Sequence, residues 1–421
     1  MEKFVIHGGK KLSGKVTVSG AKNSVLALMP ATLLNAGLNV IQNVPEVNDV
    51  YTMVKLLDHL GVSSEFSNHQ LRLDTSRITN QEAPYEHVKK MRASVYVLGP
   101  LLSRFGYAKV SLPGGCAWGP RPINLHLEAM KKLGAEIDLA EGYILAKASK
   151  LHGAKIHFDV SSVGATGNAL MAAVLAKGTT VISNAAIEPE ISLLVEYLVK
   201  MGAKINGLGK TVLEIEGVDS LRSSEVENIS DRIEAGTLLT AAALTRSKIS
   251  LDYKNSEHIE AILIKLEESG IKLLNTEDII EIDGENFVPK SVDVSANIYP
   301  GFPTDMQAQW TAYMALAEGT STITDTIYHD RFSHVPELNR LGAKIETVNN
   351  SAVVRGVKTL NGAKVMSTDL RASASLVLGG LAASGTTEVL RIYHIDRGYQ
   401  RIEEKLMSLG ADIERVKTTE F

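Results

Sequence analysis

The sequence is poor in three kinds of feature, and each shortage excludes a class of protein. It has one cysteine, so no disulfide can form within the chain, as is usual in a reducing compartment. No apolar run approaches the length of a membrane span, and no apolar stretch follows a basic N-terminus. We therefore expect a cytoplasmic protein without a signal peptide. Aromatic residues make up only 5%, so the core must be aliphatic.

The bulk composition is that of a large globular protein. Its 421 residues exceed what one hydrophobic core usually supports, which predicts two domains. Hydrophobic residues make up 44% and charged residues 22%. The formal net charge of -4 gives no support for a nucleic-acid or membrane partner.

One pattern recurs six times at intervals of about 70 residues, which indicates a repeat architecture. In each copy a helix ends at a glycine and a short strand follows, as in LDHLGVSSEF. Glycine suits this place because it adopts the left-handed conformation without a Cβ clash. The six glycines are Gly61, Gly134, Gly202, Gly270, Gly342 and Gly410.

A second pattern has the same period and is a helix of small apolar residues. Its copies end at Gly37, Gly106, Gly178, Ser247, Gly319 and Gly385. Helices that are apolar on nearly all sides are buried, and strands that alternate with helices favour α/β layers. We predict two domains of three units each, with a break near residue 229. The strand-like segment 3–19 is expected to cross over and complete the last unit, which lacks strands of its own.

Polar and charged residues recur at two places in this unit. Before or near the start of the two helices stand Lys22, Arg92, residues 162–166, Asp231, Asp305, Asp369 and Arg371, and then Asp49, Arg121, Glu188, His258, Arg331 and Arg397. Equivalent units would gather these groups at one end of each domain, and two such ends facing each other would enclose a cleft. Helix N-termini and arginine forks favour phosphate and carboxylate. A single charge of this kind is more often a cap or a solvated side chain.

The single cysteine, Cys116, lies in a loop with Gly114, Gly115 and Gly119 before a predicted helix. A thiol close to a helix N-terminus and Arg121 is favoured as thiolate, which can act as nucleophile or acid. The alternative is a small buried hydrophobic residue.

Other motifs fail. The GKT of NGLGKTVLEI lacks the earlier glycine of a phosphate loop, and no Cys or His pair has zinc spacing. The scattered histidines are interpreted as surface or polar-core residues: His59, His126, His152, His329 and His334. We predict no metal and no cofactor.

Six segments resemble the motifs of the UDP-N-acetylglucosamine 1-carboxyvinyltransferase family, in the family order. They are SGAKNS (19–24), LPGGCAWGPRP (112–122), SVGATGN (162–168), DRIEAGT (231–237), PGFPTDMQ (300–307) and DLRASASL (369–376). The resemblance implies two inside-out α/β barrels, each of three βαβαββ units, with the active site in the interdomain cleft. We place the domains at 22–229 and at 1–21 plus 230–421.

The same resemblance implies the reaction. The enolpyruvyl group of phosphoenolpyruvate passes to the 3-hydroxyl of UDP-N-acetylglucosamine by addition and elimination through a tetrahedral ketal, as the first committed step of peptidoglycan synthesis. The expected catalytic residues are Cys116, Asp305, Lys22 and Arg397. Asp305 matches a general base, and Cys116 matches the group that protonates C3 or assists product release and that fosfomycin modifies. The expected partners are these two small molecules, and a monomer is the working assumption.

The resemblance also assigns a wider set of substrate ligands: Lys22, Asn23, Arg92, Arg121, Pro122, Ile123, Asn124, Leu125, Ser162, Val163, Gly164, Asp305, Ile327, Arg331, Arg371 and Arg397. Lys22, Arg121 and Arg397 match ligands of phosphoenolpyruvate and phosphate. The turn 162–164 matches the one that holds the UDP diphosphate, and Ile327 matches a backbone contact to the sugar.

Three residues depart from the family pattern, all at the nucleotide end: Asn124 replaces Asp, Gly167 replaces Glu or Ile, and Val160 replaces Lys. Three alternatives stay open. A shikimate-type enolpyruvyl transferase has no matching PGGC loop, and an RNA 3′-phosphate cyclase finds no support in the charge. A silent paralogue that binds the UDP-sugar should have lost at least one of the proposed reactive groups.

Overall fold

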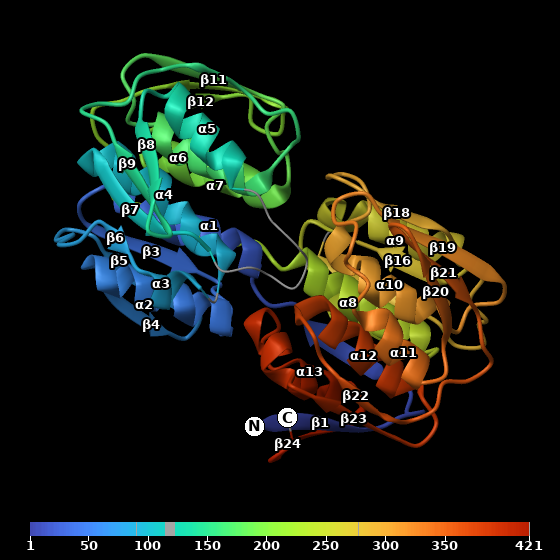
Figure 1. Cartoon of the computed structure of the whole chain (residues 1–421). Coiled ribbons are helices and arrows are strands. Elements are labelled where there is room, and N and C mark those ends of the chain that lie inside the picture. Colours follow the sequence, from blue (N-terminus) through green and yellow to red (C-terminus); the bar gives the residue numbers. More distant parts are fainter. Residues whose placement is uncertain (90, 114–122, 277, 421) are drawn as a thin grey trace. The chain divides into compact units, whose positions relative to one another are not determined.

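The structure is a computed structural model, shown in Figure 1, and it describes residues 1–89, 91–113, 123–276 and 278–420. The chain folds into two compact units. The first unit is Gly20–Ile229, and the second unit is Met1–Ser19 together with Ser230–Phe421. Each unit has its own hydrophobic core and is described by itself.

The first unit repeats one order of elements three times. The first repeat has α1 (Lys22–Ala31), η1 (Thr32–Leu34), β3 (Leu38–Gln42), α2 (Asn48–Leu60), β4 (Ser63–Ser67) and β5 (Gln70–Asp74). The second has β6 (Glu82–Ala83), α3 (Tyr85–Val88), η2 (Arg92–Val97), α4 (Leu98–Phe105), β7 (Tyr107–Ser111), α5 (Asn124–Lys132), β8 (Glu136–Ala140) and β9 (Tyr143–Lys147). The third has β10 (Lys155–His157), α6 (Val163–Ala173), β11 (Thr179–Ser183), α7 (Pro189–Lys200), β12 (Lys204–Asn206) and β13 (Val212–Glu216), and β14 (Glu225–Glu227) follows.

The second unit begins with the two N-terminal strands β1 (Glu2–His7) and β2 (Ser13–Thr17). Its first repeat has α8 (Arg232–Leu244), β15 (Lys248–Asp252), η3 (Ser256–Ile259), α9 (Glu260–Glu268), β16 (Lys272–Asn275) and β17 (Ile279–Asp283). The next has β18 (Val294–Ala296), η4 (Thr304–Met306), α10 (Gln307–Met314), β19 (Thr320–Asp325), α11 (His334–Arg340), β20 (Lys344–Val348) and β21 (Ser351–Arg355). The last has β22 (Lys364–Met366), α12 (Leu370–Ala382), β23 (Thr386–Leu390), η5 (Ile392–Arg397), α13 (Ile402–Ser408) and β24 (Asp412–Lys417).

Each repeat builds one four-stranded sheet with a single topology. In the third repeat β10 pairs in parallel with β11 across α6, β11 pairs antiparallel with β13, and β12 forms the edge. The described strands form six such sheets, three in each unit, and no strand pairing between sheets closes a barrel. The predicted α/β fold of βαβαββ units is therefore confirmed, with separate sheets placed around buried helices.

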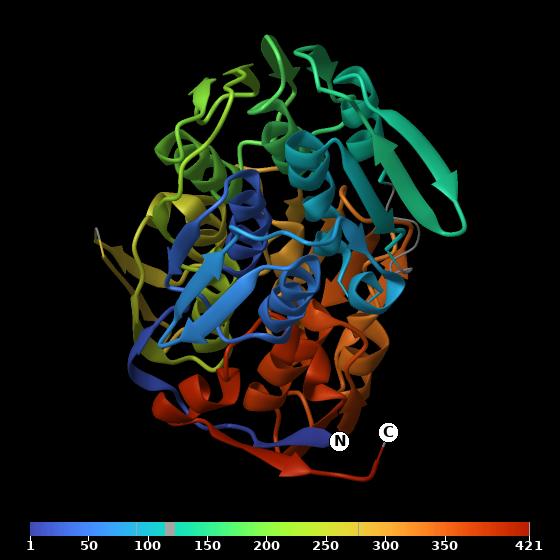
Figure 2. The same ribbon diagram turned by 90° about the vertical axis from the view of Figure 1, so that its left-hand side faces the viewer.

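The N-terminal strands supply what two repeats of the second unit lack. β1 lies between β23 and β24, with Phe4 opposite both Val389 and Arg415, so the predicted completion of the last repeat is confirmed. Figure 2 shows the two chain ends side by side as a result. The expectation was wrong for the second strand, because β2 pairs in parallel with β15 of the fourth repeat. β14 makes the same kind of pairing with β3 in the first unit.

The helices of small apolar residues form the centre of each unit. In the second unit α8, α10 and α12 pack against one another (Figure 1). Every residue of α8 except Arg232 is buried. Most are Ala, Gly, Thr, Ile or Leu, and the buried carboxylate of the helix, Glu234, is paired with Lys405. The six helix-stop glycines confirm the sequence pattern, since all have φ between 92° and 109°.

Candidate functional site

Several predicted site residues fall outside the described residues. These are Cys116, Arg121 and Pro122, together with the rest of the segment 114–122. The loop before this segment begins after β7, and α5 follows it, with Ile123 and Leu125 half-buried and Asn124 exposed. Described candidate residues occur in both units.

The first unit places a buried ion pair at the start of its first two helices. Lys22 is the first residue of α1, and its Nζ lies 3.3 Å from Oδ2 of Asp49 in the first turn of α2. Both side chains are nearly buried, and Asn23 beside them is half-buried. A buried pair is weak evidence of a stabilising role, because desolvation offsets its attraction. It does fix the ammonium, a point charge with three donors, at the N-terminal turn of α1.

The turn 162–164 begins α6. The hydroxyl of Ser162 caps the helix by accepting from the Ala165 N–H at 3.3 Å. A Cβ added to Gly164 would lie 3.1 Å from Nε2 and Cε1 of His126, so the ring of His126 covers this turn closely. The first N–H groups of a helix carry partial positive charge and lack intrahelical acceptors. The arrangement suits an anion.

The protonation of His126 follows from its neighbour Asn168. The Oδ1 of Asn168 accepts from the Gly99 N–H at 2.7 Å, and its Nδ2 donates to the Val95 carbonyl at 2.9 Å, which fixes the amide orientation. The same Nδ2 lies 3.1 Å from Nδ1 of His126, so Nδ1 must accept and the proton sits on Nε2. Nε2–H is thus a neutral donor beside the turn of Gly164.

The charge state of His126 is set by its surroundings. Its side chain is only 3% exposed, and burial, helped by the positive charge of Arg92, lowers its pKa to about 3. Arg92 is the first residue of η2 and is half-buried. The imidazole therefore stays neutral at physiological pH, while Arg92 supplies positive charge nearby. Nothing in the sequence pattern pointed to this role for His126.

The three departures from the family pattern differ in their structural setting. Gly167 has a clear reason, because a Cβ there would lie 2.8 Å from Cε1 of Tyr96. The Tyr96 hydroxyl donates to the Val163 carbonyl at 3.3 Å and so supports the turn of α6. Val160 and Asn124 are exposed, and nothing in the structure explains either of them.

In the second unit a carboxylate lies between two guanidinium groups. Oδ1 of Asp305 is 2.8 Å from NH2 of Arg331, and Oδ2 is 2.7 Å from NH2 of Arg371. Both arginine side chains are buried, whereas that of Asp305 is 24% exposed. Burial opposes a charged Arg371, but the charges of Asp305, Tyr399 and Asp231 together raise its pKa. The residues come from η4, the segment before α11, and α12, as the repeat pattern predicted.

A hydrogen-bonded layer that the sequence did not reveal supports Arg331 and Ile327. Thr304 accepts from NH1 of Arg331 at 2.9 Å and donates to Oδ2 of Asp325 at 2.6 Å. The other oxygen of Asp325 accepts the backbone N–H groups of Ile327 and Tyr328, both at 2.9 Å. Because the Ile327 N–H already donates to Asp325, we expect any backbone contact between Ile327 and a ligand to use the Ile327 carbonyl.

A second layer lies behind Arg371 and Asp305. Nε2 of Gln309 donates to the Asp305 carbonyl at 2.9 Å and lies 3.2 Å from the Tyr399 hydroxyl. Thr237 lies 2.9 Å from the same hydroxyl, and the guanidinium of Arg371 lies 5.3 Å from the centre of the Tyr399 ring. None of Gln309, Thr237 and Tyr399 was identified as a site residue from the sequence.

Two of the remaining helix-start residues are caps. Asp231 and Asp369 are N-caps: each accepts two backbone N–H groups from the first turn of its helix, α8 and α12. For these two the simpler interpretation, a cap, holds. Arg397 ends η5 and is half-buried.

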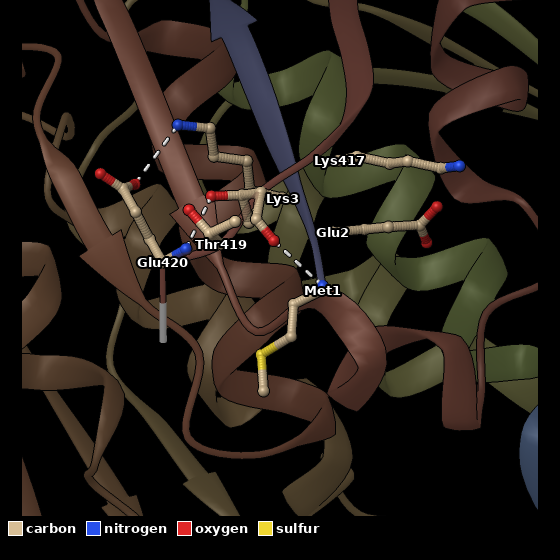
Figure 3. A pocket seen from close by; sticks show the side chains of 7 residues that line it. Met1, Glu2, Lys3, Lys417, Thr419 and Glu420 are labelled. Atoms are coloured by element: carbon tan, nitrogen blue, oxygen red, sulfur yellow. Dashed lines mark hydrogen bonds and ion pairs between the residues drawn. The ribbon is translucent and has the colours of Figure 1, made fainter.

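A hollow of about 690 Å³ lies elsewhere, at the paired chain ends (Figure 3). Its lining is Met1, Glu2, Lys3, Lys417, Thr418, Thr419 and Glu420, none of them a predicted site residue.

In the described part of the chain, no helix is both long and apolar enough to span a bilayer. The same residues contain no group of three His, Cys, Asp or Glu side chains placed for a metal.

Comparison with known proteins assigns the family. The family model described as EPSP synthase (3-phosphoshikimate 1-carboxyvinyltransferase) matches residues 6–406, so the chain belongs to this family of carboxyvinyl transferases. Among solved structures, the enolpyruvyl transferase NikO from Streptomyces tendae is similar with a TM-score of 0.90 at 26% identity, over 99% of both chains. An EPSP synthase from Acinetobacter baumannii has a TM-score of 0.77 at 17% identity, over 99% of this chain and 100% of that one, which shows the shared fold alone.

The sequence relatives narrow the assignment within the family. The UDP-N-acetylglucosamine 1-carboxyvinyltransferase of Chloroherpeton thalassium is 60% identical over 100% of this chain and 99% of its own length. That of Chlorobium luteolum is 56% identical over 100% of both. The chain thus groups with the UDP-N-acetylglucosamine 1-carboxyvinyltransferases.

Proposed function

We propose that this protein transfers the enolpyruvyl group of phosphoenolpyruvate to the 3-hydroxyl of UDP-N-acetylglucosamine and releases phosphate. The supporting relatives are 60% and 56% identical over the full chain and carry this name. The structural observation that carries the proposal is the carboxylate of Asp305 held between Arg331 and Arg371. A carboxylate oriented by two anion-binding side chains suits a hydroxyl nucleophile and an anionic electrophile together.

The reaction has two balanced steps. In the addition, the sugar oxygen forms a bond to C2 of phosphoenolpyruvate, its proton passes to a base, and C3 gains a proton. In the elimination, the C2–O bond to phosphate breaks and C3 loses a proton, which restores the double bond. No oxidant or reductant is needed, and each proton requires a group placed to take or give it.

Asp305 is the proposed base for the sugar hydroxyl. In the structure its two oxygens are paired with Arg331 and Arg371, and such pairing weakens a carboxylate as a base. An anionic substrate that binds either guanidinium competes for it and loosens its hold on Asp305. Substrate binding would then strengthen the base at the moment when it is needed.

The remaining proposed roles belong to residues of the first unit and to Arg397 of the second unit. Lys22, paired with Asp49, and Arg397 bind phosphoenolpyruvate and its phosphate. The N-terminal turn of α6 binds the diphosphate of the nucleotide through backbone N–H groups, with Arg92 adding positive charge. Cys116 and Arg121, outside the described residues, keep their proposed roles at C3 of phosphoenolpyruvate and at its phosphate.

The other expected substrate ligands contribute position and shape. Asn23 and the Ile327 carbonyl contact the sugar, and Pro122, Ile123, Asn124 and Leu125 lie beside uracil. We propose that the protein works in the cytoplasm as a monomer, in the first committed step of peptidoglycan synthesis.

The test is phosphate release from phosphoenolpyruvate with and without UDP-N-acetylglucosamine, for wild type and Cys116→Ser. Release that depends on the sugar nucleotide and falls in the variant supports the proposal. Release only with shikimate 3-phosphate would change the acceptor. Release with neither acceptor would favour a silent, binding-only protein.

A further inference from the structure

The segment that carries Arg397 is bounded by two residues in an unfavourable backbone conformation. Arg391 has φ 58° and Arg401 has φ 44°, both in the left-handed region that non-glycine residues seldom occupy. Such conformations cost on the order of 1–3 kcal/mol each and persist only where the surroundings determine them strongly. The segment 392–400 must therefore be held by other contacts.

One of these contacts is a fork from the C-terminal strand. Arg415 of β24 binds Asp396 through two parallel hydrogen bonds, NH1 to Oδ2 at 3.0 Å and NH2 to Oδ1 at 2.6 Å. Its Nε donates to Glu403 at 2.7 Å, and NH1 also donates to Glu2 at 3.0 Å. The Arg415 side chain is 16% exposed, so solvent screens these bonds less than it screens a surface pair. Asp396 is the residue directly before Arg397.

The other side of Arg397 is held as well. The hydroxyl of Tyr399, two residues further on, lies 2.9 Å from Thr237 and 3.2 Å from Nε2 of Gln309. Tyr399 is fully buried. Arg397 thus lies between an ionic anchor at Asp396 and a buried anchor at Tyr399.

The strand pairing of β24 does not depend on the fork from Arg415 to Asp396. β24 already pairs with β1 in a continuous register from Glu2 opposite Lys417 to His7 opposite Asp412. A largely buried ion pair adds little net stability over a packed apolar residue. Its two parallel bonds instead fix direction, which lysine cannot do.

We infer that Arg415 is a positioning residue: through its fork to Asp396 it fixes the segment 392–400 and so aims Arg397 at the phosphoenolpyruvate phosphate. The inference rests on the proposed function and on the role of Arg397 within it. A displacement of a substrate-binding group by about 1 Å can cost on the order of 10²-fold in rate.

The experiment compares steady-state kinetics of Arg415→Lys, Asp396→Asn and the double variant with those of Arg397→Lys. The matched control is Arg355→Lys, whose guanidinium pairs with Glu346 between two strands of the same unit at 2.7 Å but is exposed. We expect kcat/KM for phosphoenolpyruvate to fall on the order of 10- to 100-fold in each fork variant. The KM for UDP-N-acetylglucosamine should stay within twofold. The double variant should resemble Arg415→Lys, because Asp396→Asn breaks only the fork, which Arg415→Lys already removes together with the bonds to Glu403 and Glu2.

The outcomes separate the inference from the proposed function. If Arg397→Lys lowers kcat/KM for phosphoenolpyruvate but both fork variants behave like Arg355→Lys, Arg415 is not a positioning residue. If Arg397→Lys has no effect, the role of Arg397 fails and the inference fails with it. Should Arg415→Lys not fold, the isosteric Asp396→Asn decides alone, with circular dichroism to confirm its fold. A loss of affinity for both substrates together would indicate general disruption and would also overturn the inference.

Discussion

Acidification tests the assignment of a neutral, buried His126. In the unfolded chain a histidine has a pKa near 6.5, whereas burial and the charge of Arg92 lower the folded value to about 3. As pH falls from 6.5 towards 3, His126 therefore takes up a proton in the unfolded state but not in the folded state. The stabilising contribution is complete above pH 6.5 and is lost progressively between pH 6.5 and pH 3. At pH 5 about 1.5 pH units of this interval have been crossed, which corresponds to about 2 kcal/mol.

Two measurements check this value. In proteins labelled with ¹³C and ¹⁵N at histidine, the His126 signal, assigned by its loss in His126→Gln, should not move between pH 7.5 and pH 5. Its ¹⁵N shifts should show the proton on Nε2. The fall in unfolding free energy from pH 7 to pH 5, measured with urea, should be smaller by about 2 kcal/mol in His126→Gln than in wild type. His152→Gln, at an exposed site, is the matched control and should change neither result. A His126 signal that titrates near pH 6.5 would refute the reasoning.

Three further variants test other parts of the structure. Asp305→Asn should lower kcat on the order of 10²- to 10⁴-fold, and unchanged turnover would remove the proposed base. Gly167→Ala should lower the unfolding free energy by about 1 kcal/mol, because crowding against Tyr96 outweighs the gain in helix propensity; a higher melting temperature would contradict the packing. Lys405→Met should lower the free energy of unfolding by about 3 kcal/mol at pH 7, because it removes the cation that pairs with the buried Glu234. Burial already raises the pKa of Glu234. The loss should shrink at lower pH as Glu234 takes up a proton, and Lys405→Met with Glu234→Leu should recover most of it; a loss independent of pH would count against the pair.

The architecture could be predicted because it repeats. A glycine stop such as Gly134 carries its own physical reason, a left-handed residue at the end of a helix, and chance does not account for six copies at one period. The small-residue helices could be placed for the same reason. The destination of β2 could not be predicted, because its pairing with β15 depends on which repeat has an open sheet edge. Sequence separation gives no guide, since β1 pairs with strands still further along the chain.

The candidate site was predictable only where a charge sits at a repeated position. Arg331 and Arg371 were expected at the same end of the unit as Asp305, and the structure joins all three through the two ion pairs of Asp305. The supporting layer was not predictable, since Thr304, Gln309 and similar residues are common in any helix start. Their function exists only through contacts between distant segments.

The two buried histidines show why a repeat predicts position better than chemistry. His126 and His334 stand at the same distance before their helix-stop glycines, Gly134 and Gly342. Burial, and to a smaller extent the charge of a neighbouring arginine, lowers the pKa of each histidine to about 3. In the first unit Asn168 fixes the tautomer of His126 and leaves Nε2–H beside the turn of α6. In the second unit Nε2 of His334 is buried and has no hydrogen-bond partner among the described residues. Two of the six repeats therefore place a neutral imidazole at the same position, and the residue opposite the ring determines which nitrogen can serve as a donor.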